Sequence, residues 1–134
     1  MAVMVPEESV IRVEVPADPH VLHLLRSVTA SIGARMSMSL DDVEELRIAV
    51  DEAATLLLDS AHGTGGALEL ALTCTDRSLS ASVSLDPPPQ ADEEDALASW
   101  PWRVIAAVTD DASIERSVDR MTITFTKSAP GSDR

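Results

Sequence analysis

Apolar and polar side chains follow two different periods along this chain. They alternate over residues 10–15, 68–74, 79–85, 113–118 and 121–127, which predicts five short strands. Apolar residues recur every three or four positions over residues 19–33, 39–61 and 99–108, which predicts three helices. The expected order is therefore strand, two helices, two strands, helix, two strands. This order favours a two-layer α/β sandwich, in which three helices cover one face of a mixed, mostly antiparallel sheet.

The longest predicted helix, residues 39–61, has a clear start and a clear buried side. Ser39 and Asp42 can form a capping box, and further acidic residues follow in the first turn, where the helix dipole favours them. Glu52 and Leu56 lie one turn apart and outside the apolar stripe. The stripe consists of Val43, Leu46, Val50, Ala53, Leu57 and Ala61. Glu52 is thus the one carboxylate on this helix that we consider for chemistry.

Caps and breaks define the other elements. Asp18 followed by Pro19, and Ser99 followed by Pro101, can each begin a helix. We expect residues 86–95 to form a surface loop without periodicity and residues 62–66 to form a flexible turn. Cys74 shares the apolar side of its strand and is expected in the core.

Length and charge limit the classes of function. A chain of 134 residues favours one domain, residues 10–127, between a flexible segment 1–9 and a disordered tail 128–134. The net charge of −13, with ten Lys and Arg residues, argues against a nucleic-acid partner. No apolar run is long enough to cross a membrane, and a single cysteine suits a reducing cytoplasm. His20 and His23 have no further ligands at metal-binding spacing, so we expect no metal site.

Four segments resemble a known family over roughly residues 10–127. The segments LRIAVDEA, VSLD, VIAAVTDDASI and MTITFTK look like those of anti-sigma factors of the serine-kinase type. These proteins belong to the ATPase superfamily shared by gyrase, Hsp90 and histidine kinases. The resemblance implies the histidine-kinase-like ATPase fold and, on the second helix, the motif Glu-x-x-x-Asn. In that motif the glutamate is the catalytic base and the asparagine holds magnesium, which makes Glu52 the remnant base.

The chain departs from the family at three places, as in degenerate, actinobacterial-like members. Leu56 replaces the magnesium-binding asparagine, and leucine offers no oxygen to a hard cation. Asp86 matches the adenine-binding aspartate, but three prolines follow it instead of a glycine motif. Trp100 and Pro101 stand where the second glycine motif should open the last helix. By resemblance, Asp86 with Thr122 or Thr124 is the remnant adenine site, and no bound ATP or magnesium is expected unless this degenerate site still functions.

The resemblance also implies partners and the residues that contact them. We expect an anti-sigma factor that sequesters an RNA polymerase sigma factor, is antagonised by an anti-anti-sigma protein of the STAS type, and forms a homodimer. Expected partner-binding residues are Arg26, Trp100, Trp102 and Arg103. Two alternatives remain open: an active serine kinase of the same family that phosphorylates its anti-anti-sigma partner, and an unrelated α/β regulatory domain.

Each of these residues also has an ordinary structural interpretation. Glu52 alone would be a solvated helix carboxylate, and Asp86 before prolines is typical of a turn. Paired tryptophans often form the edge of a core, although Trp and Arg also dominate interface energies. Arg26 could be a surface arginine paired with a local acid, a contact worth at most about 1 kcal/mol.

Overall fold

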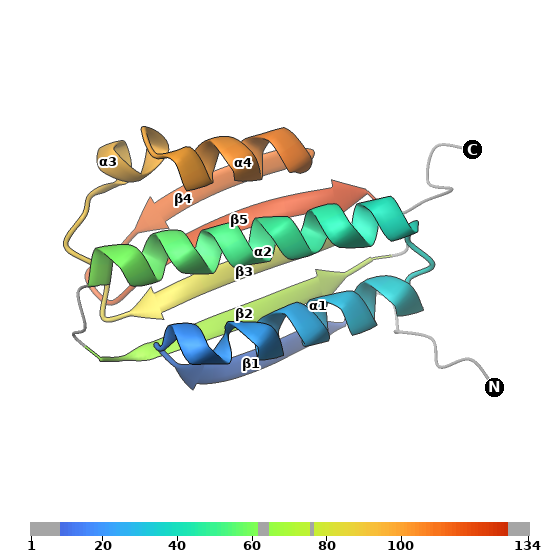
Figure 1. Cartoon of the computed structure of the whole chain (residues 1–134), viewed down its shortest axis with the longest axis horizontal. Coiled ribbons are helices and arrows are strands. Elements are labelled where there is room, and N and C mark those ends of the chain that lie inside the picture. The colour runs from blue at the N-terminus through green and yellow to red at the C-terminus, as the bar shows by residue number, and fades with distance from the viewer. Residues whose placement is uncertain (1–8, 62–64, 76, 129–134) are drawn as a thin grey trace.

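The chain forms one five-stranded sheet with helices against one of its faces (Figure 1). The structure is a computed structural model that describes residues 9–61, 65–75 and 77–128. In chain order the elements are β1 (Val10–Pro16), a 3-10 turn (Pro19–Val21), α1 (Leu22–Arg35), α2 (Leu40–Ala61), β2 (Ala67–Cys74), β3 (Ser78–Asp86), α3 (Glu93–Leu97), α4 (Trp100–Val108), β4 (Asp111–Arg116) and β5 (Met121–Ser128).

The strands lie in the order β1-β2-β3-β5-β4, and every neighbouring pair is antiparallel. β1 and β4 are the two edge strands. Helices α1, α2 and α4 lie side by side on one face of this sheet, with α2 in the middle (Figure 1). The predicted two-layer sandwich is confirmed, and within the described residues its sheet is antiparallel throughout.

The core fills the space between the sheet and α2, and the predicted alternation supplies its strand side. Each strand residue predicted to face inward on β2 and β3 is buried, Cys74 included. Leu46, Val50, Ala53 and Leu57 on α2 have no exposed surface. The strand residues that are at most 1% exposed are Leu68, Leu70, Leu72, Cys74, Leu79, Ala81, Val83, Leu85, Met121, Ile123 and Phe125. Burial of this apolar area is the main favourable term in the folding of such a domain.

Side-chain caps begin the helices at the predicted places. The Ser39 hydroxyl accepts the Asp42 N–H at 3.0 Å, which starts α2. The Asp18 carboxylate accepts the His20 N–H at 2.9 Å, although the first turn after it is 3-10 and α1 proper begins at Leu22. The predicted start at Ser39 is confirmed, whereas Asp18 caps a 3-10 turn that leads into α1.

The structure corrects the prediction of an unstructured loop over residues 86–95. Residues 93–97 form the short helix α3, and Asp92 caps it by accepting the Asp95 N–H at 2.8 Å. An acidic first turn is favoured by the helix dipole, so the same charges that suggested a loop stabilise a helix. Residues 62–64 of the predicted turn 62–66 lie outside the described residues, as do residues 1–8 and 129–134. None of the described helices is both long and apolar enough to span a membrane.

Candidate functional site

Glu52 and Leu56 lie one turn apart on α2 in different environments. Glu52 is partly exposed, and burial together with the adjacent charge of Asp51 raises the pKa of the Glu52 carboxyl above its ordinary value. Leu56 is 5% exposed and belongs to the core, so the expectation that it lies outside the buried side of α2 is wrong. A carboxyl group with a raised pKa is therefore present, but the residue one turn further on, where the resemblance expects a magnesium ligand, belongs to the core.

The end of β3 carries the next family position, Asp86. The residue is exposed, and Pro87 to Pro89 follow it, so three successive backbone nitrogens have no hydrogen to donate. The backbone of Gly66 packs directly against this point: a Cβ at Gly66 would lie 2.5 Å from the Asp86 carbonyl oxygen. Gly66 therefore fills the space beside the Asp86 carbonyl, and the three residues after Asp86 offer no backbone N–H group to a ligand.

Ser99 accepts hydrogen bonds from two backbone N–H groups in the first turn of α4. The Ser99 hydroxyl accepts the Trp102 N–H at 3.3 Å and donates to the Ala96 carbonyl at 2.6 Å. The Ser99 carbonyl accepts the Arg103 N–H, and Pro101 has no N–H to offer. A helix N-terminus binds phosphate through unpaired N–H groups, and this one retains few of them.

Thr122 and Thr124 lie on the face of the sheet that points away from the helices, whereas Glu52 lies on α2. Their neighbours on β5, Ile123 and Phe125, are buried beneath the helices, so alternation directs both threonines to the open face of the sheet. On that face the Thr122 and Ser84 hydroxyl groups form a hydrogen bond of 2.9 Å. The structure does not bring these threonines together with the glutamate on α2.

Arg26 lies on α1 where this helix meets α2. Its Nε donates to Asp51 Oδ1 at 3.0 Å, and its side chain is 40% exposed. Arg26 and Asp51 line a hollow of about 310 Å³ together with Glu44, Arg47 and Ile48. Pairing with a local acid, one of the two interpretations of Arg26, is the geometry found in the unbound chain.

The other expected partner-binding residues lie on α4. Trp100 is 70% exposed and Arg103 is exposed, whereas Trp102 packs against the core. Because α1 and α4 flank α2 on opposite sides, Arg26 and Trp100 belong to separate parts of the surface (Figure 1). The two tryptophans therefore differ in role, one contributing to the core and one to the surface.

Sequence reasoning missed Lys127, which ties three elements together. It is 9% exposed, and its ammonium group donates to Glu45 on α2 and, at 3.0 Å, to the Val108 carbonyl at the end of α4. The alternation along β5 indicates that Lys127 lies on the buried side of the strand, although it does not indicate the partners of Lys127. Such a group is stable inside the protein only when charge and hydrogen bonds compensate for lost water.

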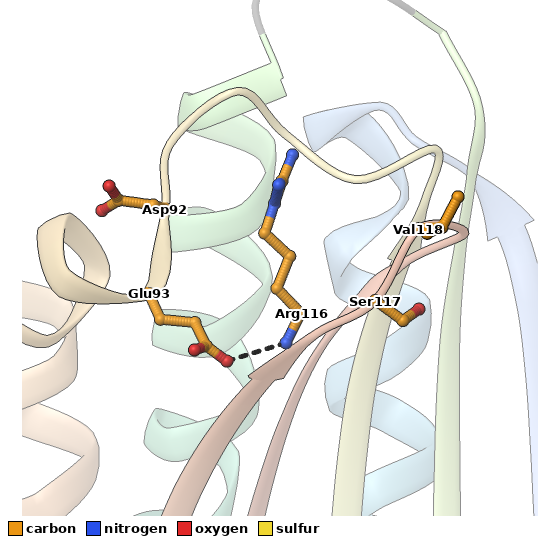
Figure 2. A pocket seen from close by; sticks show the side chains of 5 residues that line it. All are labelled: Asp92, Glu93, Arg116, Ser117 and Val118. Atoms are coloured by element: carbon orange, nitrogen blue, oxygen red, sulfur yellow. Dashed lines mark hydrogen bonds between the residues drawn. The ribbon is translucent and has the colours of Figure 1, made fainter.

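Arg116 was also missed, and it fixes the proline segment against β4. A hollow of about 520 Å³ lies between the start of α3 and the β4–β5 turn, and Arg116 is one of the residues that line it (Figure 2). The Arg116 guanidinium donates to the Pro89 carbonyl at 2.8 Å, and its backbone N–H donates to Glu93 Oε2 at 2.9 Å. These bonds hold residues 87–93 in place and cover part of an edge strand.

The raised pKa of the Glu52 carboxyl predicts that removing its charge stabilises the fold in a pH-dependent way. Because the folded chain binds this proton more tightly than the unfolded chain, ionised Glu52 destabilises the fold at neutral pH. We expect Glu52→Gln to raise the free energy of unfolding slightly at pH 8, by at most about 0.5 kcal/mol. The gain should shrink as the pH falls through the folded-state pKa and be mostly lost at pH 4, just below the ordinary glutamate pKa of about 4.3. Urea unfolding from pH 8 to pH 4 measures this, and a gain independent of pH would contradict it.

Comparison with known proteins places this arrangement in a family. The chain is 35% identical over 66 residues to the serine-protein kinase RsbW of Halalkalibacterium halodurans, covering 49% of this chain and 41% of that protein. It is 35% identical over 52 residues to the serine-protein kinase RsbW of Bacillus velezensis, covering 39% of this chain and 32% of that protein. The chain thus matches less than half of these relatives.

A solved structure and a family model extend the comparison. The crystal structure of the RsbU and RsbW domains of Rv1364c from Mycobacterium tuberculosis superposes with a TM-score of 0.73 at 17% identity, covering 91% of this chain and 33% of that chain. At this identity the likeness concerns the fold. The family model for the histidine kinase-like ATPase domain matches residues 15–127. The chain therefore belongs to the histidine kinase-like ATPase domain family and, within it, resembles the serine-protein kinases RsbW.

Proposed function

We propose that the protein is an anti-sigma factor that binds and sequesters an RNA polymerase sigma factor in the cytoplasm. An anti-anti-sigma protein of the STAS type would compete for it and release the sigma factor. The similarity to two RsbW proteins supports this class of function. Family membership removes the alternative of an unrelated α/β regulatory domain.

The observation that carries the proposal is the state of the phosphate-binding end. ATP and magnesium, which the family implies, do not fit the residues found there. Leu56 is buried and has no oxygen for magnesium, and three prolines follow Asp86. The first turn of α4 is capped by Ser99. Lost or weakened ATP binding and kinase activity therefore form part of the proposal.

The other residues that match the family motifs do not replace the missing contacts to phosphate and magnesium. Glu52 would be a base without a positioned phosphate or hydroxyl, and a base alone transfers nothing. Asp86, Thr122 and Thr124 stay candidates for a remnant adenine site, but the threonines lie on the open face of the sheet. We assign this chain to partner binding rather than phosphoryl transfer.

ATP binding is the direct test of this loss. We expect calorimetry to give a Kd weaker than about 1 mM with or without magnesium, and the B. velezensis relative serves as positive control in the same assay. Leu56→Asn should not restore binding, because the prolines would still withhold their donors. Micromolar binding that needs magnesium, or an active kinase in the single mutant, would contradict the proposal.

One observation favours the alternative of an active serine kinase. Glu52 is retained, and its raised pKa suits a general base. Incubation with labelled ATP and a STAS protein encoded in the same genome separates the two: phosphate on a serine of that protein would establish the kinase.

Copurification tests the partner itself. The tagged full-length chain expressed in its native host should retain a sigma factor, identified by mass spectrometry, and adding the STAS protein should release it. A tagged chain that recovers no sigma factor, while the purified protein is folded by circular dichroism, would refute sequestration.

We also propose a homodimer, as the family resemblance implies. The uncovered strand edge of β1 gives mild support, because its outward N–H and C=O groups have no neighbouring strand within the described residues. Light scattering at micromolar concentration is expected to give twice the chain mass. A single species near 14.3 kDa would exclude the dimer.

A further inference from the structure

The backbone of the edge strand β4 has hydrogen-bonding groups that point away from the sheet. Among the described residues β4 pairs only with β5 (Figure 1). The Arg116 N–H points outward, because it donates to Glu93 Oε2 at 2.9 Å, whereas the next N–H, that of Ser117, bonds back across the β4–β5 turn. Backbone groups of successive residues in an antiparallel strand alternate between its two sides. The N–H and C=O groups of Ala112 and Ile114 therefore point outward as well.

These outward groups are available to another strand. Among the described residues no hydrogen bond is made by the outward groups of Ala112 and Ile114, and only Arg116, at the end of the strand, has its N–H capped. Each of the two free residues offers one donor and one acceptor. A sheet edge of this kind can bind an extended segment of another protein through backbone hydrogen bonds, while the side chains along the edge select the segment.

The side chains of β4 indicate which segment fits. Ala112 and Ile114 are half-buried on the helix side and pack against the core. Asp111, Ser113 and Glu115 are exposed on the open face, where their neighbours on β5 are threonines. Neither acid forms an ion pair within the part of the chain that the structure describes. An added strand would follow the same alternation, so its apolar residues would extend the helix-side surface and its basic residues would pair with the acids.

Charge makes a second copy of this chain a poor occupant of this edge. Antiparallel pairing of two copies of β4 about Ser113 would place Asp111 of each copy opposite Glu115 of the other. Like charges directly opposite one another destabilise a strand pair. The exposed residues of the β1 edge include both Arg12 and Glu14, so that edge has mixed charge and lacks this repulsion. The two edges therefore suit different partners.

We propose that β4 (Asp111–Arg116) is a docking edge for an extended, basic segment of a protein partner in which basic and apolar residues alternate. The segment adds as a further strand antiparallel to β4, with its apolar side chains on the helix side and its basic side chains beside Asp111 and Glu115. The proposal goes beyond sigma-factor sequestration and does not depend on it, because it rests on β4 alone and identifies the partner by its chemistry.

A designed peptide tests this edge directly. Acetyl-Lys-Val-Lys-Val-Lys-amide can place its valines opposite Ile114 and Ala112 and its terminal lysines beside the two acids of β4. We expect saturable downfield shifts of the Ala112 and Ile114 amide protons in NMR spectra of the full chain, with a Kd on the order of millimolar. The outward amide protons of β1 should move little. Equal shifts along both edges, or no saturable shift up to about 20 mM, would overturn the proposal.

A modified peptide separates strand pairing from general attraction to an acidic protein. N-methyl groups on both valines keep the charge of the peptide and remove the two N–H donors that face β4. We therefore expect this peptide to bind at least about tenfold more weakly than the unmodified one. Equal affinity of the two peptides would mean that net charge alone causes binding, and the proposal would be wrong.

A matched pair of variants tests the contribution of the acids. Asp111→Asn combined with Glu115→Gln should weaken binding of the unmodified peptide by roughly tenfold, because the facing lysines lose their partners. Asp41→Asn combined with Asp59→Asn removes the same charge from exposed sites on α2 and should change the Kd less than about twofold. Equal Kd values for the two double variants would refute the selection of a basic segment by β4.

Discussion

Arg26→Ala is expected to weaken sigma-factor binding by roughly thirty- to a thousandfold and to leave the fold intact. The physical reason is the loss of a planar, always charged group that pairs with a carboxylate through two bonds. The folded chain depends little on Arg26, because its contact with Asp51 is a half-exposed ion pair worth less than about 1 kcal/mol. Surface plasmon resonance for affinity and thermal unfolding for stability measure the two effects separately.

Arg35→Ala is the matched control for this prediction. Arg35 lies at the end of the same helix, is exposed, and makes no ion pair among the described residues. Its removal changes the net charge by the same amount and should alter affinity less than about twofold. Near-wild-type affinities for both variants would remove Arg26 from the interface and reduce its contact with Asp51 to a local surface pair.

Much of the fold was predictable because period alone separates its elements. Alternation in the last two strand pairs placed residues such as Val83 and Phe125 on the buried side, and both are buried. Lys127 continues the same alternation but was not predicted, because lysine is usually exposed. Its burial depends on Glu45, 82 residues away in sequence, and no local pattern reports such a contact.

The width of the buried side of α2 also could not be predicted from the sequence of that helix alone. A single apolar stripe predicts contact with one layer and leaves Leu56 outside the buried side of the helix. In the structure α2 is flanked by α1 and α4 as well as by the sheet, so a wider arc of the helix is buried and Leu56 falls within it. Leu56 thus adds to the core at the position where the family resemblance expects a magnesium ligand, which explains why a leucine is favourable there.

Sequence reasoning names candidate residues for the site but does not give their arrangement in space. The family motifs propose Glu52 and Asp86, yet they could not show that Gly66 packs against the Asp86 backbone. The alternation of β5 already implied that Thr122 lies on the face opposite Ile123, which conflicts with a site shared with the helix layer. Sequence likewise offered no way to pair Arg26 with Asp51, which lies 25 residues further along the chain.

The contact of Gly66 with Asp86 leads to the largest expected change in stability. Gly66→Ala should lower the free energy of unfolding by about 3 kcal/mol or more. A Cβ at this position would lie 2.5 Å from the Asp86 carbonyl oxygen and 2.8 Å from Pro87 Cδ, and its φ of 108° is one that L residues rarely adopt. The clash cannot be relieved by rotating a flexible side chain, since the atoms it meets are backbone and a proline ring.

Gly65→Ala is the control that separates the clash from the strained dihedral. Gly65 also has a positive φ, 78°, but a Cβ there would meet no atom within 4 Å, so only the backbone term of about 1–2 kcal/mol applies. Thermal unfolding should therefore show a drop in Tm of roughly 10 °C or more for Gly66→Ala and less than half of that for Gly65→Ala. Equal drops would mean that the dihedral alone is responsible and that the Gly66 backbone does not close the end of β3. A larger drop for Gly66→Ala would support the view that protein atoms fill the space on this side of Asp86, while the three prolines that follow Asp86 offer no N–H donors on the other side.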